Sequence, residues 1–258
     1  MTQNERRIFL IKYLLAENPQ YKKIEMPETE DEQKHLLRAL FNMRPPLFVS
    51  NDFLTVQNEY LMEETSKKGI TKLSDLTPVF NDDIYLWQGD ITTLECGAIV
   101  NAANSALLGC FSPNHSCIDN AIHTFAGVQL RLECDKIMKK QEHDEETGKA
   151  KITDAYNLPC KYIIHTVGPI VQDVLLPQHK ELLAGCYNSC LNLAVENKID
   201  SIAFCCISTG VFGFPQKEAA QIAFKTVQDF KQKTLSKIKV IFNVFTDRDK
   251  MIYENLFK

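Results

Sequence analysis

Five short apolar runs, spaced along residues 84–245, constrain the fold of this chain more than any other feature. Longer segments separate them, and several of these segments show the 3.6-residue periodicity of helices. Apolar strands that alternate with helices are typical of a sheet covered on both faces. The pattern therefore predicts an α/β fold. The runs are IYLWQG from Ile84, AIVNAA from Ala98, YIIHTVG from Tyr162, IAFCCIS from Ile202 and VIFNVF from Val240.

The segments between these runs give the helices. Helical periodicity predicts helices over about 118–138, 178–197 and 216–232. The segment KKQEHDEETGKA, residues 139–150, is charged and poor in apolar residues, so we expect a solvated loop there.

The chain before the first strand has a different character. One helix with an apolar face comes first, a second begins with a capping box at Thr29 and ends before Pro45, and a third ends near Gly69. No convincing strand pattern is present. We expect a helical extension over residues 1–78 and a second unit over 79–258, with simple packing as the plainest role for the extension.

Composition limits the classes of function. The chain has 29 Lys and Arg against 33 Asp and Glu, a net charge of −4, so no broad basic surface is available for nucleic acid. Its nine cysteines are an odd number scattered through apolar segments, which favours free thiols in a reducing cytoplasm. We find no signal peptide and no apolar run long enough to span a bilayer. A chain of 258 residues needs no metal to support its core, so a metal would serve another purpose.

A glycine-containing run follows the fourth apolar strand. In ISTGVFGFP, Gly210 and Gly213 allow successive N–H groups to turn toward one point ahead of a helix that starts after Pro215. Such a loop suits a diphosphate, and it lacks the lysine of a P-loop NTPase. An ordinary turn is the alternative interpretation.

Polar residues also follow the first two apolar strands. Asp90 could accept a hydrogen bond from the exocyclic amine of a base, and Asn101 and Asn104 could bind ribose hydroxyls. Taken singly, each is more often a cap or a turn residue.

A C-x4-H-x-C spacing lies between the second strand and the next helix. Cys110, His115 and Cys117 make a donor set suited to Zn²⁺, and three protein ligands leave one position open, as in catalytic zinc sites. Buried free cysteines and a capping histidine are the alternative.

Together these residues resemble the successive signature segments of macrodomains. GDIT (89–92), NAAN (101–104), IDNAIH (118–123), HTVGP (165–169) and STGVFGFP (208–215) occur in the family's order, over about residues 83–258. GCFSPNHSC, at residues 109–117, resembles the zinc-containing branch, protein-ADP-ribose hydrolases found in bacteria and fungi, as does the helical extension. The resemblance implies a three-layer α/β/α macrodomain with a mixed sheet.

The resemblance also implies a role for each site residue. Asp90 would bind the adenine amino group with a backbone contact from Ile91, and Phe245 would face the adenine ring. Asn101 and Asn104 would hold the distal ribose, with Asp119 beside its reacting C1″ carbon and one Zn²⁺ nearby; Asp119 and Asn104 are the expected catalytic residues. The expected diphosphate contacts are Ser208, Thr209, Gly210, Val211 and Phe212, and the expected metal ligands are Cys110, His115 and Cys117.

The implied activity is zinc-dependent removal of mono-ADP-ribose from a protein side chain, most simply an ester to Asp or Glu. A non-catalytic reader of ADP-ribose with a structural zinc, a deacetylase of O-acetyl-ADP-ribose and, further off, a redox-sensing thiol protein remain alternatives. His123 and His165 are expected to be structural. The resemblance implies a monomer that acts opposite a sirtuin-like ADP-ribosyl transferase.

Overall fold

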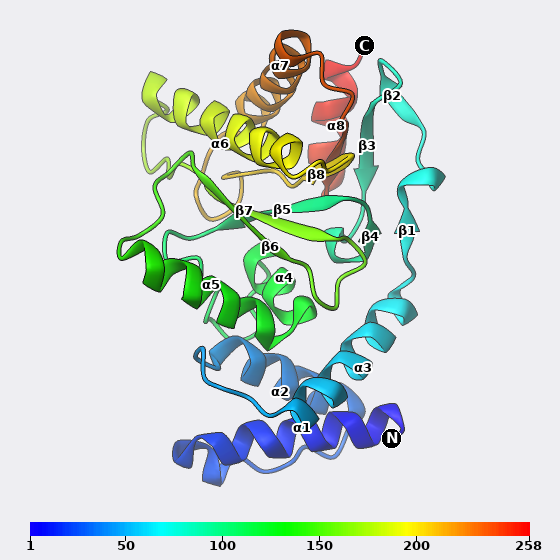
Figure 1. The fold of residues 1–258 in the computed structure, drawn as a ribbon, viewed down its shortest axis with the longest axis vertical. Helices are drawn as coiled ribbons and strands as arrows, with labels where there is room; N and C mark the ends of the chain where they lie inside the picture. Colours follow the sequence, from blue (N-terminus) through cyan, green and yellow to red (C-terminus); the bar gives the residue numbers. More distant parts are fainter.

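A seven-stranded mixed sheet forms the centre of the computed structural model, which describes residues 1–258 (Figure 1). The five inner strands run parallel, and the edge strands β2 and β6 run antiparallel to their neighbours. The five apolar runs form the five inner strands, so the predicted α/β fold is confirmed. In spatial order the strands are β2 (Pro78–Phe80), β3 (Ile84–Gln88), β9 (Lys239–Val244), β8 (Ser201–Phe204), β5 (Ala98–Ala103), β7 (Tyr162–Val167) and β6 (Ala150–Asp154).

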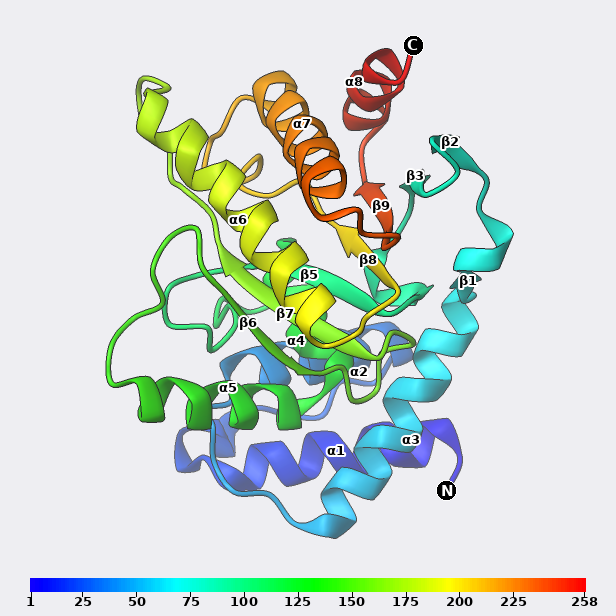
Figure 2. The ribbon, with the colours of Figure 1, turned by 45° about the horizontal axis from the view of Figure 1, so that its top comes forward.

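Helices cover both faces of this sheet (Figures 1 and 2). One face carries α6 (Pro177–Glu196), α7 (Gln216–Thr234) and α8 (Asp247–Leu256), and the other carries α4 (Ile118–Ala126) and α5 (Val128–Gln141).

The single helix expected over residues 118–138 is wrong, because α4 and α5 are separate helices that meet at Gly127. Its φ of 95° is a left-handed conformation that favours glycine. A Cβ at this position would also lie 2.6 Å from Nε2 of Gln57. Gly127 therefore ends α4 and lets α5 start in a new direction.

No apolar run in the sequence predicts edge strand β6 or a short second ladder between β1 (Thr71–Lys72) and β4 (Leu94–Glu95). Strand β6 lies at the sheet edge with only Thr153 buried, so it has no apolar run. β1 pairs with β4 in a separate two-residue ladder, within a region where no strand was expected. Short 3-10 turns complete the elements at Pro19–Lys23, Leu73–Asp75 and Ile91–Thr93.

Three helices form the N-terminal extension: α1 (Gln3–Glu17), α2 (Glu30–Met43) and α3 (Asn51–Lys68). The predicted capping box is present at the start of α2, where Thr29 accepts from the backbone N–H of Glu32. The extension has its own core of 11 buried residues, and one of them, Val128, belongs to α5. Figure 1 shows α2 and α3 below α4 and α5, and both α2 and α3 contact α4, so the extension packs on this helical layer.

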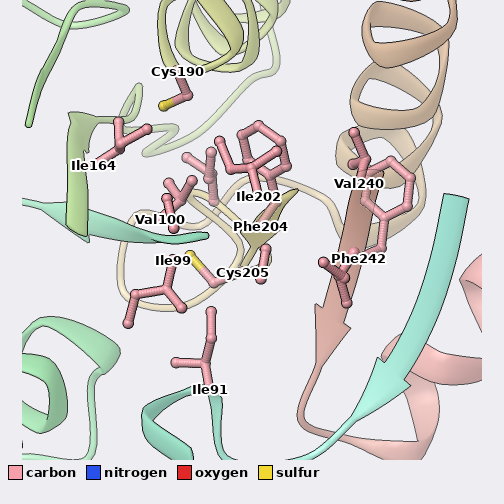
Figure 3. Close-up of a cluster of buried hydrophobic side chains, with 14 of the residues drawn as sticks. Ile91, Ile99, Val100, Ile164, Cys190, Ile202, Phe204, Cys205, Val240 and Phe242 are labelled. Atoms are coloured by element: carbon pink, nitrogen blue, oxygen red, sulfur yellow. The ribbon is translucent and has the colours of Figure 1, made fainter. Parts of the chain in front are cut away.

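The main core lies between the sheet and its helices. Alternate residues of each inner strand point to opposite faces. In Figure 3, Val100 lies on the same side of β5 as Cys190 of α6, and Ile99 lies on the opposite side, toward Ile91. All nine cysteines are free thiols, and no helix is long and apolar enough to cross a membrane.

Candidate active site

The polar residues singled out in the sequence meet at one edge of the sheet. Asp90 follows β3, Asn104 follows β5 and Phe245 follows β9, while the loop that begins at Cys205 follows β8. These four strands are parallel, so their carboxyl ends share an edge, where open α/β sheets bind ligands.

Cys110, His115 and Cys117 come together in the loop between β5 and α4. One ligand atom from each lies within 4.8 Å of the others, and all three residues are partly buried. Two thiols and an imidazole at this separation fit a tetrahedral Zn²⁺ that keeps a fourth position open. Burial raises the pKa of Cys117 to about 11, with the neighbouring Cys110 acting in the same direction. A bound cation reverses this effect, because metal ligation requires the thiolate.

Cys117 also caps the N-terminus of α4, and this places Asp119 in the first helical turn. The Sγ of Cys117 accepts from the backbone N–H of Asn120 at 3.4 Å. The Asp119 carboxylate is buried and accepts from Nδ2 of Asn101 at 2.8 Å and from Nδ2 of Asn104 at 3.4 Å. One possible metal donor, Cys117, and a buried carboxylate therefore share one helix start.

The environment of Asp119 changes its acidity. Burial raises its pKa to about 6, while the Asn101 hydrogen bond and the charge of Arg131 act in the opposite direction. The Asp119 carboxyl can therefore hold or release a proton near neutral pH.

A buried hydrogen-bonded chain supports this carboxylate from behind. Asn101 is fully buried, and its Nδ2 lies 3.1 Å from Nδ1 of His165, whose Nε2 lies 3.0 Å from Oγ1 of Thr153. Nδ1 therefore accepts from Asn101 and Nε2–H donates to Thr153. Burial lowers the pKa of His165 to about 4, so the ring is neutral.

His123 and Cys134 complete a second group of possible ligands with His165, within 4.8 Å of one another. Both His165 nitrogens already have hydrogen-bond partners, so His165 has no free nitrogen for a metal. We therefore interpret this group as structural support around Asp119. Nε2 of His123 lies 3.6 Å from Oδ1 of Asp119, and burial holds the pKa of His123 well below its usual range.

At the far end of the same edge, Asp90 is already paired. Its Oδ1 accepts from the backbone N–H and the hydroxyl of Thr92, at 3.0 and 2.6 Å, and its Oδ2 lies 2.9 Å from Nζ of Lys68. Burial raises the pKa of Asp90, but Thr92 and Lys68 together lower it by more, so the net shift is downward. Ile91 is buried beside it, whereas the Phe245 side chain is exposed.

The loop after β8 presents unused backbone donors. Ser208 has a left-handed φ of 64°, and the turn is closed by hydrogen bonds from Gly213 N–H to Gly210 O and from Phe214 N–H to Ser208 O. Successive N–H groups that face one concavity make an anion site. The N–H groups with no acceptor in the protein are those of Ser208, Gly210, Val211 and Phe212.

Several residues that contact the site were missed from the sequence. Lys68 contacts Asp90, and Arg131 donates to the carbonyl of Leu108 at the start of the loop that carries Cys110, His115 and Cys117. Asn120 lies in the IDNAIH segment directly after Asp119, so its position in that motif could have identified it as a site residue. Arg38 and Asn42 of α2 contact the loop as well, and no local pattern marks them.

Comparisons with known proteins agree with this geometry. The family model described as Macro domain matches residues 100–223. The chain is 59% identical to a protein-ADP-ribose hydrolase of Treponema medium, over 99% of both chains. It is 49% identical to the protein-ADP-ribose hydrolase of Staphylococcus aureus strain MRSA252, over 100% of this chain and 97% of the relative. The Trypanosoma brucei macrodomain in complex with ADP-ribose superposes with a TM-score of 0.67 at 28% identity, over 90% of this chain and 97% of that one.

Proposed function

This chain belongs to the Macro domain family and is a hydrolase, and from that premise we propose that it removes mono-ADP-ribose from modified protein side chains. We further propose that Cys110, His115 and Cys117 hold one Zn²⁺ beside the bond that is cleaved, and that the substrate is an ester of Asp or Glu. Such an enzyme reverses the product of an ADP-ribosyl transferase, for which a sirtuin-like enzyme is the proposed counterpart.

One observation carries this proposal: Cys117, one of three possible metal donors that lie close together, and the Asp119 carboxylate lie at the start of the same helix. Cys117 is the N-cap of α4 and Asp119 is in its first turn. The positive end of the helix favours both a thiolate and a carboxylate there. A site that only binds ADP-ribose has no need of a buried carboxylate with a pKa of about 6 beside a metal centre.

The rest of the edge accounts for binding of the nucleotide. Asp90, kept ionised by Thr92 and Lys68, is a strong acceptor for the adenine amino group, with Ile91 providing a backbone contact. Phe245 covers the adenine ring. The free N–H groups of Ser208, Gly210, Val211 and Phe212 donate to the diphosphate, and Thr209 lies between them in the same loop. Asn104 frames the distal ribose next to Asp119.

The proposed reaction breaks the bond between C1″ and the acceptor oxygen, and forms a bond from a water oxygen to C1″. Asp119 accepts the proton that this water loses, while Asn101 and Asn104 fix the orientation of its two oxygens. Cys110, His115 and Cys117 would hold the Zn²⁺, which would supply Lewis-acid chemistry at the substrate oxygen.

The charges in the site favour an ester substrate. A departing carboxylate is a weak base and leaves without a proton, whereas a departing amine or guanidine needs one. His123, beside Asp119, has a pKa well below its usual range and cannot serve as that acid at neutral pH. A site with a base and no ready acid fits the ester.

The test is release of ADP-ribose from an acceptor modified on Glu, using purified chain of measured metal content. Asp119→Asn should lower the release rate by on the order of 100- to 10,000-fold while ADP-ribose binding is retained. Asp229→Asn, on the exposed surface of α7, is the matched control and should leave the rate unchanged. Release by Asp119→Asn at the wild-type rate would show that Asp119 takes no part in the reaction. Equal release rates before and after chelation would show that the metal takes no part in it.

A further inference from the structure

Helix α2 of the N-terminal extension contacts the metal-binding loop directly. The guanidinium of Arg38 donates to the backbone carbonyl of His115 at 3.1 Å. The same guanidinium donates twice to Oδ1 of Asn120, at 2.9 Å from Nη2 and 3.3 Å from Nε. Arg38 thus contacts both the backbone of the proposed ligand His115 and the side chain of Asn120, which bonds to the rest of the loop.

Asn120 in turn hydrogen-bonds to both proposed cysteine ligands, Cys110 and Cys117. It is fully buried, and its Nδ2 donates to the carbonyls of Ser112 at 3.0 Å and Cys110 at 3.4 Å. Its backbone N–H donates to Sγ of Cys117. The fork of Arg38 fixes the Asn120 amide with its oxygen toward α2 and its nitrogen toward the loop.

Asn42, one turn further along α2, holds the tip of the loop. Its Oδ1 accepts from the backbone N–H of Asn114 at 2.9 Å, and its Nδ2 donates to Oγ1 of Thr124 at 2.9 Å. Asn114 has a left-handed φ of 55°, a conformation that asparagine tolerates better than most residues. The contact therefore stabilises the sharp turn that directs His115 back toward the cysteines.

Arg131 fastens the start of the loop to the end of α2. Its Nε donates to the carbonyl of Leu108 at 2.6 Å, and its Nη1 donates to the carbonyls of Phe41 at 3.0 Å and Asn42 at 2.9 Å. A guanidinium at the C-terminus of a helix also complements the helix dipole. The loop is held at its start, tip and end by contacts that run to α2.

We propose that α2 is a working part of the metal centre, in which Arg38 and Asn42 are positioning residues that hold residues 110–117 in the liganding conformation before the metal binds. This inference rests on the proposed metal site. A loop that is already ordered loses less conformational entropy when it takes up a metal, so the pre-formed loop binds more tightly. Loss of residues that orient metal ligands typically weakens metal binding by 10- to 100-fold. The extension has a role beyond packing.

The experiment compares Arg38→Met and Asn42→Ala with the full wild-type chain. Arg6→Met is the matched control, because Arg6 pairs with Glu59 and Glu63 of α3 inside the extension and does not touch the loop. Zinc affinity is measured by competition with a chromophoric chelator. The geometry of the site is read from the absorption bands of the cobalt-substituted protein, which report thiolate ligation. Both loop variants should bind zinc about 10- to 100-fold more weakly, with altered cobalt bands, and Arg6→Met should match the wild type.

Hydrogen exchange of the metal-free protein gives a second readout, independent of metal and of activity. The Asn114 N–H has Asn42 as its partner, so its exchange should be about 10-fold faster in Asn42→Ala than in Arg6→Met. Wild-type zinc affinity and cobalt bands in both loop variants would overturn the inference, as would an equal loss in Arg6→Met. If the wild type itself takes up no zinc, the metal part of the proposed function fails. The exchange rate then decides the inference: faster exchange supports α2 as the support of the loop, and unchanged exchange overturns it.

Discussion

Nζ of Lys68 lies 2.9 Å from Oδ2 of Asp90, and this ion pair joins the last residue of α3 to the turn after β3. The same ammonium lies 3.3 Å from the centre of the Phe125 ring on α4. The extension thus reaches the proposed adenine end of the site as well as the metal-binding loop.

Removal of the ammonium should weaken nucleotide binding modestly. Lys68 helps to keep Asp90 ionised and oriented, but the pair is about one third exposed, so its contribution is small. We expect Lys68→Met to weaken ADP-ribose binding by about 2- to 5-fold in calorimetric titration. Lys67→Met is the control, since Lys67 pairs with Glu63 and Glu64 instead. Tighter binding by Lys68→Met would instead mean that the ammonium competes with adenine for Oδ2.

A methyl group at Gly168 should disturb the proposed diphosphate loop. A Cβ there would lie 2.0 Å from Oγ of Ser208 and 2.9 Å from Cγ2 of Ile207, so the start of the loop would have to shift. We expect Gly168→Ala to weaken ADP-ribose binding about 10-fold. Adding Ser208→Gly should restore most of the binding, because glycine removes the closer of the two clashes and suits the φ of 64°.

Gly185→Ala is the matched control for this substitution. Gly185 lies inside α6, and a Cβ there would meet only ordinary contacts at 3.5 Å with Gly148. Binding should be unchanged, and the helix should gain slightly in stability. If Gly168→Ala binds as the wild type does, the position of Ser208 does not matter to the ligand.

Burial of His165 should make stability depend on pH. Its folded pKa of about 4 lies below the ordinary histidine value of 6.5, so between these two pH values the unfolded chain binds a proton that the folded chain does not bind. Acid therefore favours the unfolded state, and the free energy of unfolding should fall as pH drops from about 6.5 to about 4, by roughly 3 kcal/mol at most.

Urea titrations of the wild type and His165→Gln at several pH values check this. The raised pKa of Asp119 has the opposite effect on the free energy of unfolding in part of this pH range. Both proteins contain Asp119, so its contribution cancels when the two pH profiles are subtracted. Parallel pH profiles for the two proteins would show that His165 does not control the acid response.

Arg131 should be important for stability as well as for the position of the loop. Arg131→Met leaves the buried carbonyls of Leu108, Phe41 and Asn42 without their donor. We expect a loss of about 2–4 kcal/mol in the free energy of unfolding, since unsatisfied buried groups cost about 1–3 kcal/mol each and partial relaxation recovers some of it. Arg248→Met, at an exposed position of α8, should change it by less than about 0.5 kcal/mol. A similar loss in both variants would refute the assignment.

The inner sheet could be predicted from the sequence because helices cover both of its faces, so each inner strand is rich in apolar residues. Edge strand β6 gave no such signal, since four of its five residues are not fully buried. The break between α4 and α5 depends on one glycine conformation, which periodicity does not register.

For the site, distance along the chain separates what could be predicted from what could not. Cys110, His115 and Cys117 are close in sequence, and their spacing could be recognised. Arg38 meets the carbonyl of His115 across 77 residues, and its pairing with Asn120 spans 82. Such contacts are set by the way α2 packs on α4, and a single sequence carries no spacing that encodes them.

The order of strands in the sheet has a consequence for how the protein is made. Strand β3, which leads to Asp90, has β9 as its inner neighbour, and β9 is the last strand of the chain. The proposed metal-binding loop and the residues that contact it have all been synthesised once α5 has left the ribosome, whereas β3 can pair only with β2 until Lys239–Val244 have been synthesised. The two ends of one site therefore mature at different times during translation. A nascent chain can therefore form the proposed metal-binding loop before it can form the proposed nucleotide end of the site.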